Sequence, residues 1–222
     1  MSLGGQERRD SGIHRICIPD AAERGNLAVF VERALRLDEA AVIRLHTRTD
    51  GLVAAWVATG FDVLACRVLA GSVQPPDVTC SADALRAGLA APDESGCCDI
   101  GYSMDSSWRT ALPPETGFFH LDDVPANVLF NLARQGADLA REHAGPQGPP
   151  ASLLDQEVLQ VMADKETLGV PMRCVMALVA MGFITGAGDE IVRFRLSPSW
   201  LRIDAHYGSV FRRRGAPSLF LR

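Results

Sequence analysis

The amino-acid sequence predicts an α+β protein in two parts, an antiparallel-sheet N-terminal domain with helices and a winged-helix-like C-terminal domain. Three observations lead to this fold class. Apolar and polar residues alternate in short runs joined by turn residues in the first half, which indicates antiparallel strands. A Gly-Pro-Gln-Gly-Pro-Pro segment at residues 145–150 interrupts all periodicity. Beyond it, two helical patterns precede an arginine-rich paired-strand pattern, which is the element order of a winged helix.

Composition and length are those of a globular protein. With 222 residues the chain can form two modest domains, and its 47% hydrophobic and 22% charged residues lie in the ordinary range. No apolar run reaches the roughly 18 residues of a membrane span. The N-terminus is polar and lacks the apolar centre of a secretory signal. We therefore expect a cytoplasmic protein with no membrane partner.

The N-terminal domain is expected at residues 13–144, after a disordered N-terminus at residues 1–12. It opens with a short strand at His14–Ile18, which Pro19 stops. Asp20 then caps a helix, because a carboxylate at this position accepts hydrogen bonds from free backbone amides. The buried face of this helix is marked by apolar residues at helical spacing: Leu27, Phe30, Val31, Ala34 and Leu35.

A meander of strands follows this helix. Three strands are expected, at Ala41–His46, Leu52–Ala58 and Phe61–Ala70. The Asp50-Gly51 pair between the first two supplies the turn of a hairpin. A short strand at Val78–Cys80 leads into a helix that Ser81 caps and that runs to Leu89. Helices and antiparallel strands in this order are typical of an α+β domain.

The rest of this domain is expected to add two strands and a helix. The strands are predicted at Asp99–Met104 and Phe118–Leu121. The amphipathic helix that follows has Pro125 in its first turn and Gly145 just past its end. The order of a strand, a helix, a strand meander and then VTCSADALRAGLA resembles one module of the DNA sliding-clamp fold. The resemblance rests on element order, and a fold shared in this way does not by itself imply a function.

The winged-helix-like domain is expected at residues 151–214, between the Pro/Gly linker at 145–150 and a tail at 215–222. Its first helix, second helix and hairpin turn are predicted at Ser152–Met162, Val170–Phe183 and Gly186–Asp189. The second helix has one charged side chain, Arg173, whereas helices in the major groove present polar side chains to base edges. We therefore expect this helix to be buried or to contact a partner chain rather than to contact bases.

Arginines of the C-terminal part are the candidate nucleic-acid-binding residues. Arg193 and Arg195 alternate with apolar residues, so they share one face of a strand and would contact phosphates without sequence preference. The alternative is a solvated arginine face without a ligand. The complete set of candidates is Arg173, Arg193, Arg195, Arg202, Arg212, Arg213 and Arg214.

Charge is distributed unevenly along the chain. Residues 1–150 carry 20 acidic and 13 basic side chains, whereas residues 151–222 carry 7 and 9. A basic segment beside an acidic body indicates a polyanion or an acidic partner. Of the 22 basic residues, only Lys165 is a lysine. A G+C-rich genome explains this bias, so the arginine content by itself is weak support for nucleic-acid binding.

The six cysteines include no Cys-x-x-Cys pair and no histidine at zinc-ligand spacing. Three of them, Cys17, Cys66 and Cys174, lie within apolar runs, where a thiol behaves as a small hydrophobic group. We expect reduced, structural thiols, as is usual in the cytosol. A redox role for the neighbours Cys97 and Cys98 is the alternative.

No residue pattern indicates an active site or a metal site. His120 lies near Asp122 and Asp123, but one histidine–carboxylate pair does not make a metal site. A second group alternates on one strand face, as an anion-binding surface or a solvated sheet face: Arg44, His46 and Arg48. Phosphate-binding loops and hydrolase motifs do not occur. We therefore predict no catalytic residue, no metal ligand and no cofactor.

The arginine bias together with the segments EHAGPQGPPASLLDQEVL, GVPMR and MGFI resembles an uncharacterised actinobacterial protein family. The resemblance covers most of the chain and implies no activity. The leading hypothesis is a non-enzymatic cytosolic interaction or regulatory protein that docks a partner chain, or a second copy of itself, through the winged-helix-like module. One alternative is a transcription-regulator-like DNA binder that uses the basic hairpin and tail for phosphate contacts. A second is an enzyme or small-ligand binder acting in the N-terminal domain.

Overall fold

The structure is a computed structural model that describes residues 14–142, 151–163, 166–186 and 190–214. The first half contributes β1 (Arg15–Cys17), α1 (Ala21–Leu37), β2 (Val42–Thr47), β3 (Val53–Ala58), β4 (Leu64–Leu69), β5 (Ser72–Gln74), β6 (Asp77–Ser81), α2 (Ala82–Ala90) and β7 (Cys97–Asp99). The second contributes the 3-10 turn η1 (Asp105–Ser107), β8 (Phe119–Pro125), α3 (Ala126–Glu142), α4 (Ala151–Asp155), β9 (Glu157–Ala163), β10 (Glu166–Pro171), α5 (Met172–Ala180), β11 (Ile191–Leu196), β12 (Trp200–Ala205) and β13 (Gly208–Arg213).

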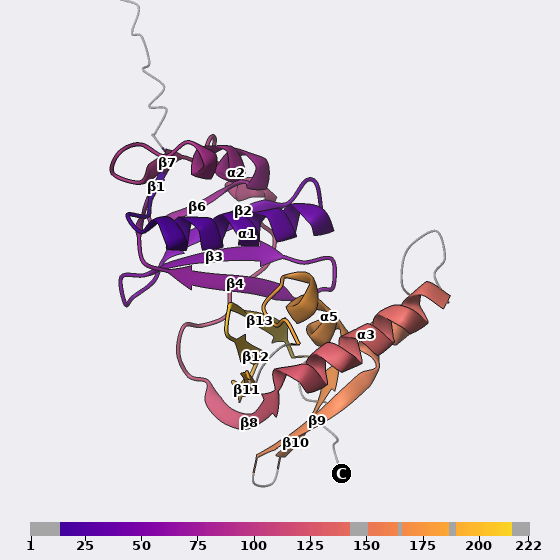
Figure 1. The fold of residues 1–222 in the computed structure, drawn as a ribbon. Coiled ribbons are helices and arrows are strands. Elements are labelled where there is room, and N and C mark those ends of the chain that lie inside the picture. Colours follow the sequence, from indigo (N-terminus) through magenta and orange to yellow (C-terminus); the bar gives the residue numbers. More distant parts are fainter. Residues whose placement is uncertain (1–13, 143–150, 164–165, 187–189, 215–222) are drawn as a thin grey trace, which may run out of the picture.

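Eight of the described strands form one continuous antiparallel sheet in the order β6-β2-β3-β4-β13-β12-β11-β8 (Figure 1). The first four strands come from the first half of the chain and the last four from the second half. The halves meet where β4 pairs with β13, with Leu64 opposite Phe211 and Cys66 opposite Ser209. Because backbone hydrogen bonds cross this junction, the two halves share one sheet rather than forming separate layers.

Alternation along the strands assigns the two faces of the sheet. On β2, Ile43 and Leu45 are buried and belong to the main core, which α1, α2, α3 and α5 cover. Phe30 of α1 stacks on Phe183, just after α5, with ring centroids 6.2 Å apart, so this core joins both halves. The helix predicted after Asp20 is confirmed as α1, since the Asp20 carboxylate accepts hydrogen bonds from the backbone amides of Ala22 and Glu23.

The opposite face, called the outer face below, carries a second apolar cluster around Trp56, Trp200 and Phe211. The crossing segment (residues 100–118) links the halves and covers this cluster with Trp108, Leu112 and Phe118. Strand β3 is consequently buried on both faces, which explains why its sequence, VAAWVA, is apolar throughout.

The predicted fold class, an α+β N-terminal domain followed by a winged-helix-like domain, is wrong, because the described chain is mostly sheet and one eight-stranded sheet runs through both halves. Only α4, at Ala151–Asp155, is helical where a helix was predicted over Ser152–Met162; the rest is β9, which pairs with β10 in a hairpin. Strand β11 pairs with β12 and β8, and so belongs to the eight-stranded sheet instead of forming a separate wing. The physical reason is that Val158, Leu159 and Val161 fit a helical or a strand period equally well, and pairing with β10 decides between them.

The domain boundary predicted at 145–150, with the N-terminus at 1–12 and the tail at 215–222, falls outside the described residues. Helix α3 precedes that boundary and helix α5 follows it, and the two helices pack against each other. Among the described residues, no helix is long and apolar enough to cross a membrane.

The prediction of a fully reduced set of cysteines is wrong for one pair. Cys17 and Cys97 form a disulfide between directly opposite residues of β1 and β7. The four remaining thiols are free and buried: Cys66, Cys80, Cys98 and Cys174. Burial raises the pKa of all four thiols, to about 12 for Cys80 and Cys174. The 80-residue separation hid the disulfide, because no local spacing marks strands that pair across such a distance.

Candidate functional site

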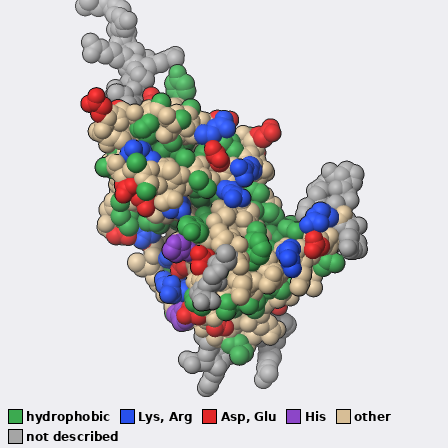
Figure 2. Space-filling view, in the orientation of Figure 1, with side chains coloured by type: hydrophobic (Ala, Val, Ile, Leu, Met, Phe, Trp, Pro, Cys, Tyr) green, Lys and Arg blue, Asp and Glu red, His purple; other side chains and the backbone are tan. Residues whose placement is uncertain are grey.

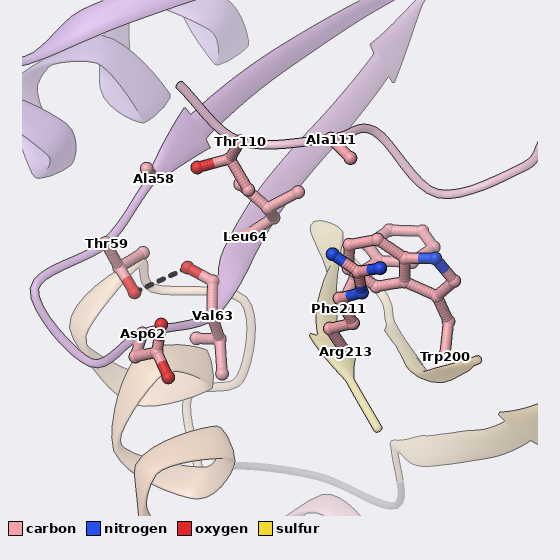
Figure 3. Close-up of a pocket in the computed structure, with 10 residues that line it drawn as sticks. All are labelled: Ala58, Thr59, Asp62, Val63, Leu64, Thr110, Ala111, Trp200, Phe211 and Arg213. Carbon is pink, nitrogen blue, oxygen red and sulfur yellow. Dashed lines mark hydrogen bonds between the residues drawn. The ribbon is translucent and has the colours of Figure 1, made fainter. Parts of the chain in front are cut away.

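A pocket of about 200 Å³ opens on the outer face where the two halves of the chain meet (Figure 3). Four separate segments form it: the end of β3 with the β3–β4 turn, the crossing segment, the start of β12, and β13. Its lining residues are Ala58, Thr59, Asp62, Val63, Leu64, Thr110, Ala111, Trp200, Phe211 and Arg213. We call it the junction pocket, because none of the segments forms it alone.

The β3–β4 turn is one wall of the junction pocket, and hydrogen bonds hold it in shape. The Thr59 hydroxyl donates to the Val63 carbonyl at 2.8 Å (Figure 3), and the Thr59 amide donates to the same oxygen at 3.0 Å. Asp62 has φ of 58°, a left-handed conformation that aspartate tolerates better than most residues. The carboxylate of Asp62 is 91% exposed and lies 3.5 Å from the Arg173 guanidinium, so it forms an acidic group at the rim.

Arg173 supports this turn from beneath. Its guanidinium donates to the Phe61 carbonyl at 2.8 Å and to the Asp155 carboxylate at 2.6 Å, and lies 3.5 Å from Asp62. The side chain is 10% exposed. The structure therefore places this predicted nucleic-acid-binding residue inside the protein, between α5 and the turn.

The other walls of the junction pocket are mainly apolar. Trp200 and Phe211 are only 6% and 5% exposed, and they belong to the outer-face cluster together with Leu64. The ring centroids of Phe211 and Trp56 lie 5.0 Å apart, and this contact fixes the orientation of the Phe211 ring. Arg213 is directly opposite Trp200 in the β12–β13 register and is exposed, so it supplies a positive charge at the rim. The pocket thus has a lining of mixed character, with apolar surface from Leu64, Trp200 and Phe211 and with one acidic and one basic group at its edge.

Four of the predicted arginines come together on the outer face. Register and alternation place Arg193, Arg195, Arg202 and Arg213 on this same face of β11, β12 and β13. Asp204 lies among them and pairs with Arg202 at 2.7 Å and with Arg195 at 3.3 Å. Alternation turns Arg212 toward the opposite face, and Arg214 lies at the end of β13, where its amide donates to the Ser199 carbonyl.

Arg202 is also in contact with aromatic rings. Its guanidinium carbon lies 5.7 Å from the Phe118 ring centroid and 5.4 Å from that of Phe211. Cation–π contacts of this kind position the arginine over the outer-face cluster. Phosphate binding by these arginines stays a prediction. Figure 2 shows that acidic and basic side chains lie interspersed over the described part of the face turned toward the viewer.

The second arginine-rich strand face is paired with carboxylates. Arg44 donates twice to Asp77, and Arg48 pairs with Asp50. His46 lies 3.6 Å from Asp77 and 3.6 Å from Glu115 of the crossing segment. Hydrogen bonds from Arg44 lower the pKa of Asp77, and the Thr49 hydroxyl does the same for Glu115. The contacts of Glu115 with His46 and Thr49 hold the crossing segment on the sheet.

The remaining histidine candidate is on β8, where His120 lies 3.7 Å from Asp123 on the surface. In the part of the chain that the structure describes, no three His, Cys, Asp or Glu side chains are grouped as metal ligands. Sequence reasoning missed the residues of the junction pocket. The available signal was the unbroken apolar run of β3, which indicates a strand covered on both faces.

Two family models match the chain in sequence. Residues 13–110 match a domain of unknown function, DUF8010, and residues 113–217 match another, DUF8185. The two matches meet within the crossing segment. None of the curated proteins matches the chain. These results agree with the uncharacterised family that the sequence resembles, but they do not support an actinobacterial origin.

Solved structures of bacterial sliding clamps are similar to this chain. The DNA polymerase sliding clamp of Bacillus subtilis aligns with a TM-score of 0.58 at 11% identity, covering 94% of this chain and 67% of the clamp. The polymerase III β subunit of Caulobacter crescentus aligns with a TM-score of 0.55 at 14% identity, covering 92% of this chain and 66% of the subunit. The DnaN clamp of Bartonella birtlesii bound to griselimycin aligns with a TM-score of 0.50 at 14% identity, covering 92% of this chain and 67% of the clamp.

At these identities the likeness shows the fold. It overturns the winged-helix prediction a second time and agrees with the sliding-clamp resemblance of the N-terminal element order. The chain spans about two thirds of the length of the clamp subunits. The chain thus matches two domains of unknown function and is similar in fold to bacterial sliding-clamp subunits.

Proposed function

We propose that this chain is a protein-docking module whose junction pocket takes an apolar side chain from an extended segment of a partner protein. The observation that carries the proposal is the apolar surface that Leu64, Trp200 and Phe211 contribute to the pocket at the junction of the two halves. Partner proteins bind most strongly where an aromatic or aliphatic side chain enters such a desolvated pocket. The charges of Asp62 and Arg213 at the rim would orient the bound segment.

Pocket size favours a side chain over a cofactor. Sites for cofactors and drug-sized ligands enclose roughly 300–1,000 Å³, whereas the junction pocket encloses about 200 Å³. A volume of this size fits one large side chain of a peptide. The likeness to sliding clamps supports a protein- or DNA-associated role, and the Bartonella clamp held griselimycin in its crystal. The cytosolic location expected from the sequence is part of this proposal.

The proposal is tested by selecting peptides from a random library against the protein. Ala58 is an exposed, small residue that lines the pocket, so Ala58→Arg fills the pocket without removing core atoms. Ala87→Arg, on the exposed face of α2, is the matched control. We expect enriched peptides that carry large apolar residues, bind the wild type and the control alike, and bind Ala58→Arg at least tenfold more weakly. The proposal would be refuted if the enriched peptides bound Ala58→Arg as tightly as the wild type, or if no peptides were enriched at all.

A second candidate, a DNA-associated role, is favoured by the four arginines that share the outer face. Phosphate contacts make affinity fall steeply with salt. Binding of a DNA duplex at low salt that weakens tenfold or more at physiological salt, and that Arg193→Ala with Arg213→Ala reduces, would support this role. No binding at low salt would exclude it. A thermal-shift screen with metals and nucleotides tests the small-ligand alternative in the N-terminal half.

A further inference from the structure

A second pocket, of about 190 Å³, lies at the junction of the two halves on the face of the sheet that the helices cover. Alternation along β4 places Arg67 on the same side as Ala65 of the main core, whereas Leu64 and Cys66 belong to the outer-face cluster. We call it the helix-side pocket. The described residues that line it come from α1, β4, the segment after α5 and the β12–β13 turn: Asn26, Val29, Phe30, Arg67, Met181, Gly182, Phe183 and Tyr207.

The helix-side pocket has an apolar floor and a partly apolar opening. The stacked rings of Phe30 and Phe183 are each 2% exposed, and Met181 beside them is also buried. Val29 and Tyr207, in contrast, are 56% and 39% exposed, so they lie where the pocket opens to solvent. A ligand that enters between them can therefore place an apolar group against the two phenylalanine rings.

Arg67 supplies a positive charge in the wall of this pocket. Its Nη1 atom donates to the Tyr207 carbonyl at 2.7 Å, and its Nε atom is buried with no hydrogen-bond partner in the described part of the chain. Arginines of the outer face such as Arg44 and Arg202 pair with carboxylates, whereas Arg67 pairs with none among the residues that the structure describes. Burial lowers the pKa of Arg67, and the charge of Glu23 offsets this only in part. An anion in the pocket would compensate this partly desolvated cation.

A second arginine lies beside the same pocket. A Cβ on Gly182 would be 3.3 Å from the Arg33 Nε atom, so the guanidinium of Arg33 lies against the backbone that lines the pocket. Arg33 is half-buried and, within the described ranges, forms no ion pair. The two arginines outweigh the single nearby carboxylate, that of Glu23, and the local charge therefore favours an anionic ligand.

We propose that the helix-side pocket binds a small organic acid, with its apolar body against Phe30 and Phe183 and its carboxylate on Arg67. A carboxylate matches the planar donor fork of a guanidinium, whereas an inorganic anion would leave the apolar floor unused. Sites for cofactors and drug-sized ligands enclose roughly 300–1,000 Å³, so about 190 Å³ fits a compact acid such as benzoate or phenylacetate. This site lies on the opposite face of the sheet from the junction pocket and does not depend on the docking function proposed above.

The test titrates the full chain with benzoate, phenylacetate and hexanoate by calorimetry, with benzyl alcohol and inorganic phosphate as comparison ligands. We expect at least one of the acids to bind with a Kd of about 1 mM or tighter, and both comparison ligands to bind at least tenfold more weakly than that acid. Arg67→Met keeps the apolar stem and should weaken binding of the acid at least tenfold.

Two surface variants provide a test that does not disturb the core. Val29→Glu places a negative charge at the exposed opening of the pocket and should also weaken binding of the acid at least tenfold. Val128→Glu, at an exposed position of α3, is the matched control and should bind like the wild type. If Arg67→Met does not fold, the comparison of Val29→Glu with Val128→Glu decides the question.

Four other results overturn the inference. The first is that none of the three acids binds. The second is that phosphate or benzyl alcohol binds as tightly as the acids, because the site then reads only charge or only apolar character. The third is that Val29→Glu binds the acid like the wild type, which places the bound acid elsewhere. The fourth is that the peptide N-acetyl-Gly-Gly-Phe binds although no small acid does, because the site then recognises the end of a chain.

Discussion

Arg173 connects α5 to the turn that forms one wall of the junction pocket. In the sequence it is the single charge on an apolar helix, which is compatible with a ligand contact or with burial. The structure places its guanidinium against the Phe61 carbonyl and the Asp155 carboxylate. The sequence therefore predicts that the Arg173 guanidinium binds oxygen atoms, and only the fold decides that these oxygens belong to the protein itself.

Replacing this arginine should loosen the turn. Arg173→Met keeps the apolar stem but leaves the Phe61 carbonyl without its donor, so we expect a loss of about 1–3 kcal/mol in the free energy of unfolding. Arg86→Ala is the control, because Arg86 pairs with Asp83 on the exposed surface and its loss should change stability by less than about 0.5 kcal/mol. Urea unfolding of both variants measures the difference. Equal effects would show that Arg173 does not support the turn.

The carboxylates of the outer face should make stability depend on pH. Hydrogen bonds from Arg44 lower the pKa of Asp77, and those from Arg48 lower the pKa of Asp50. A group whose pKa is depressed in the folded state stabilises it above the ordinary pKa, near 4, and this contribution is lost as the pH falls through the folded-state value.

We therefore expect the free energy of unfolding to be nearly constant between pH 7 and 5 and to fall below pH 5. Asp77→Asn removes one of the depressed carboxylates, so its unfolding free energy should be lower at pH 7 and should decline less steeply with acid. Chemical denaturation at several pH values provides the measurement. A variant with an unchanged slope would show that Asp77 contributes little to acid sensitivity.

At the scale of elements, strong local periodicity is enough to predict several helices and strands from the sequence. The helices predicted after Asp20, Ser81 and Pro125 are present as α1, α2 and α3. The meander of β2, β3 and β4 also lies where alternation predicted it. The helix predicted over Ser152–Met162 includes most of β9, because the apolar residues there are compatible with both periods, and the pairing with β10 decides for a strand. Local pattern decides an element only when no distant strand competes for it.

Two glycines should respond to alanine in opposite directions. Gly25 is an exposed position inside α1, and a Cβ there would meet nothing within 4 Å. Gly25→Ala should therefore raise stability by about 0.5–1 kcal/mol, because alanine favours the helix more than glycine does. At Gly208, where β13 begins, a Cβ would lie 2.5 Å from the Phe183 ring and 2.8 Å from the Cys66 carbonyl oxygen.

Gly208→Ala should consequently lower stability by about 1–3 kcal/mol, since the sheet would have to shift at the junction of the two halves. Thermal unfolding of the pair compares them directly. If both substitutions raised the melting temperature, the close approach of β4 and β13 at Gly208 would be contradicted.

At the scale of the whole molecule, the continuous sheet and the shared core should make the halves unfold together. The β4–β13 pairing and the Phe30–Phe183 stack both cross the junction. Separating the halves would expose the edges of β4 and β13 and the apolar surfaces behind them. We expect tryptophan fluorescence and far-UV circular dichroism to report one coincident unfolding transition. Two resolved transitions would indicate that the halves are independent domains.

The sequence by itself determined the strongly periodic helices and strands of the first half and the resemblance of their order to a sliding-clamp module, because these signals lie within about twenty neighbouring residues. Tertiary structure alone decided that β11, β12 and β13 extend the first sheet, that Cys17 meets Cys97, and that four segments enclose the junction pocket. The physical reason is that a strand's hydrogen-bonding partner, and therefore which side chains share a face, depends on contacts between residues far apart in the chain.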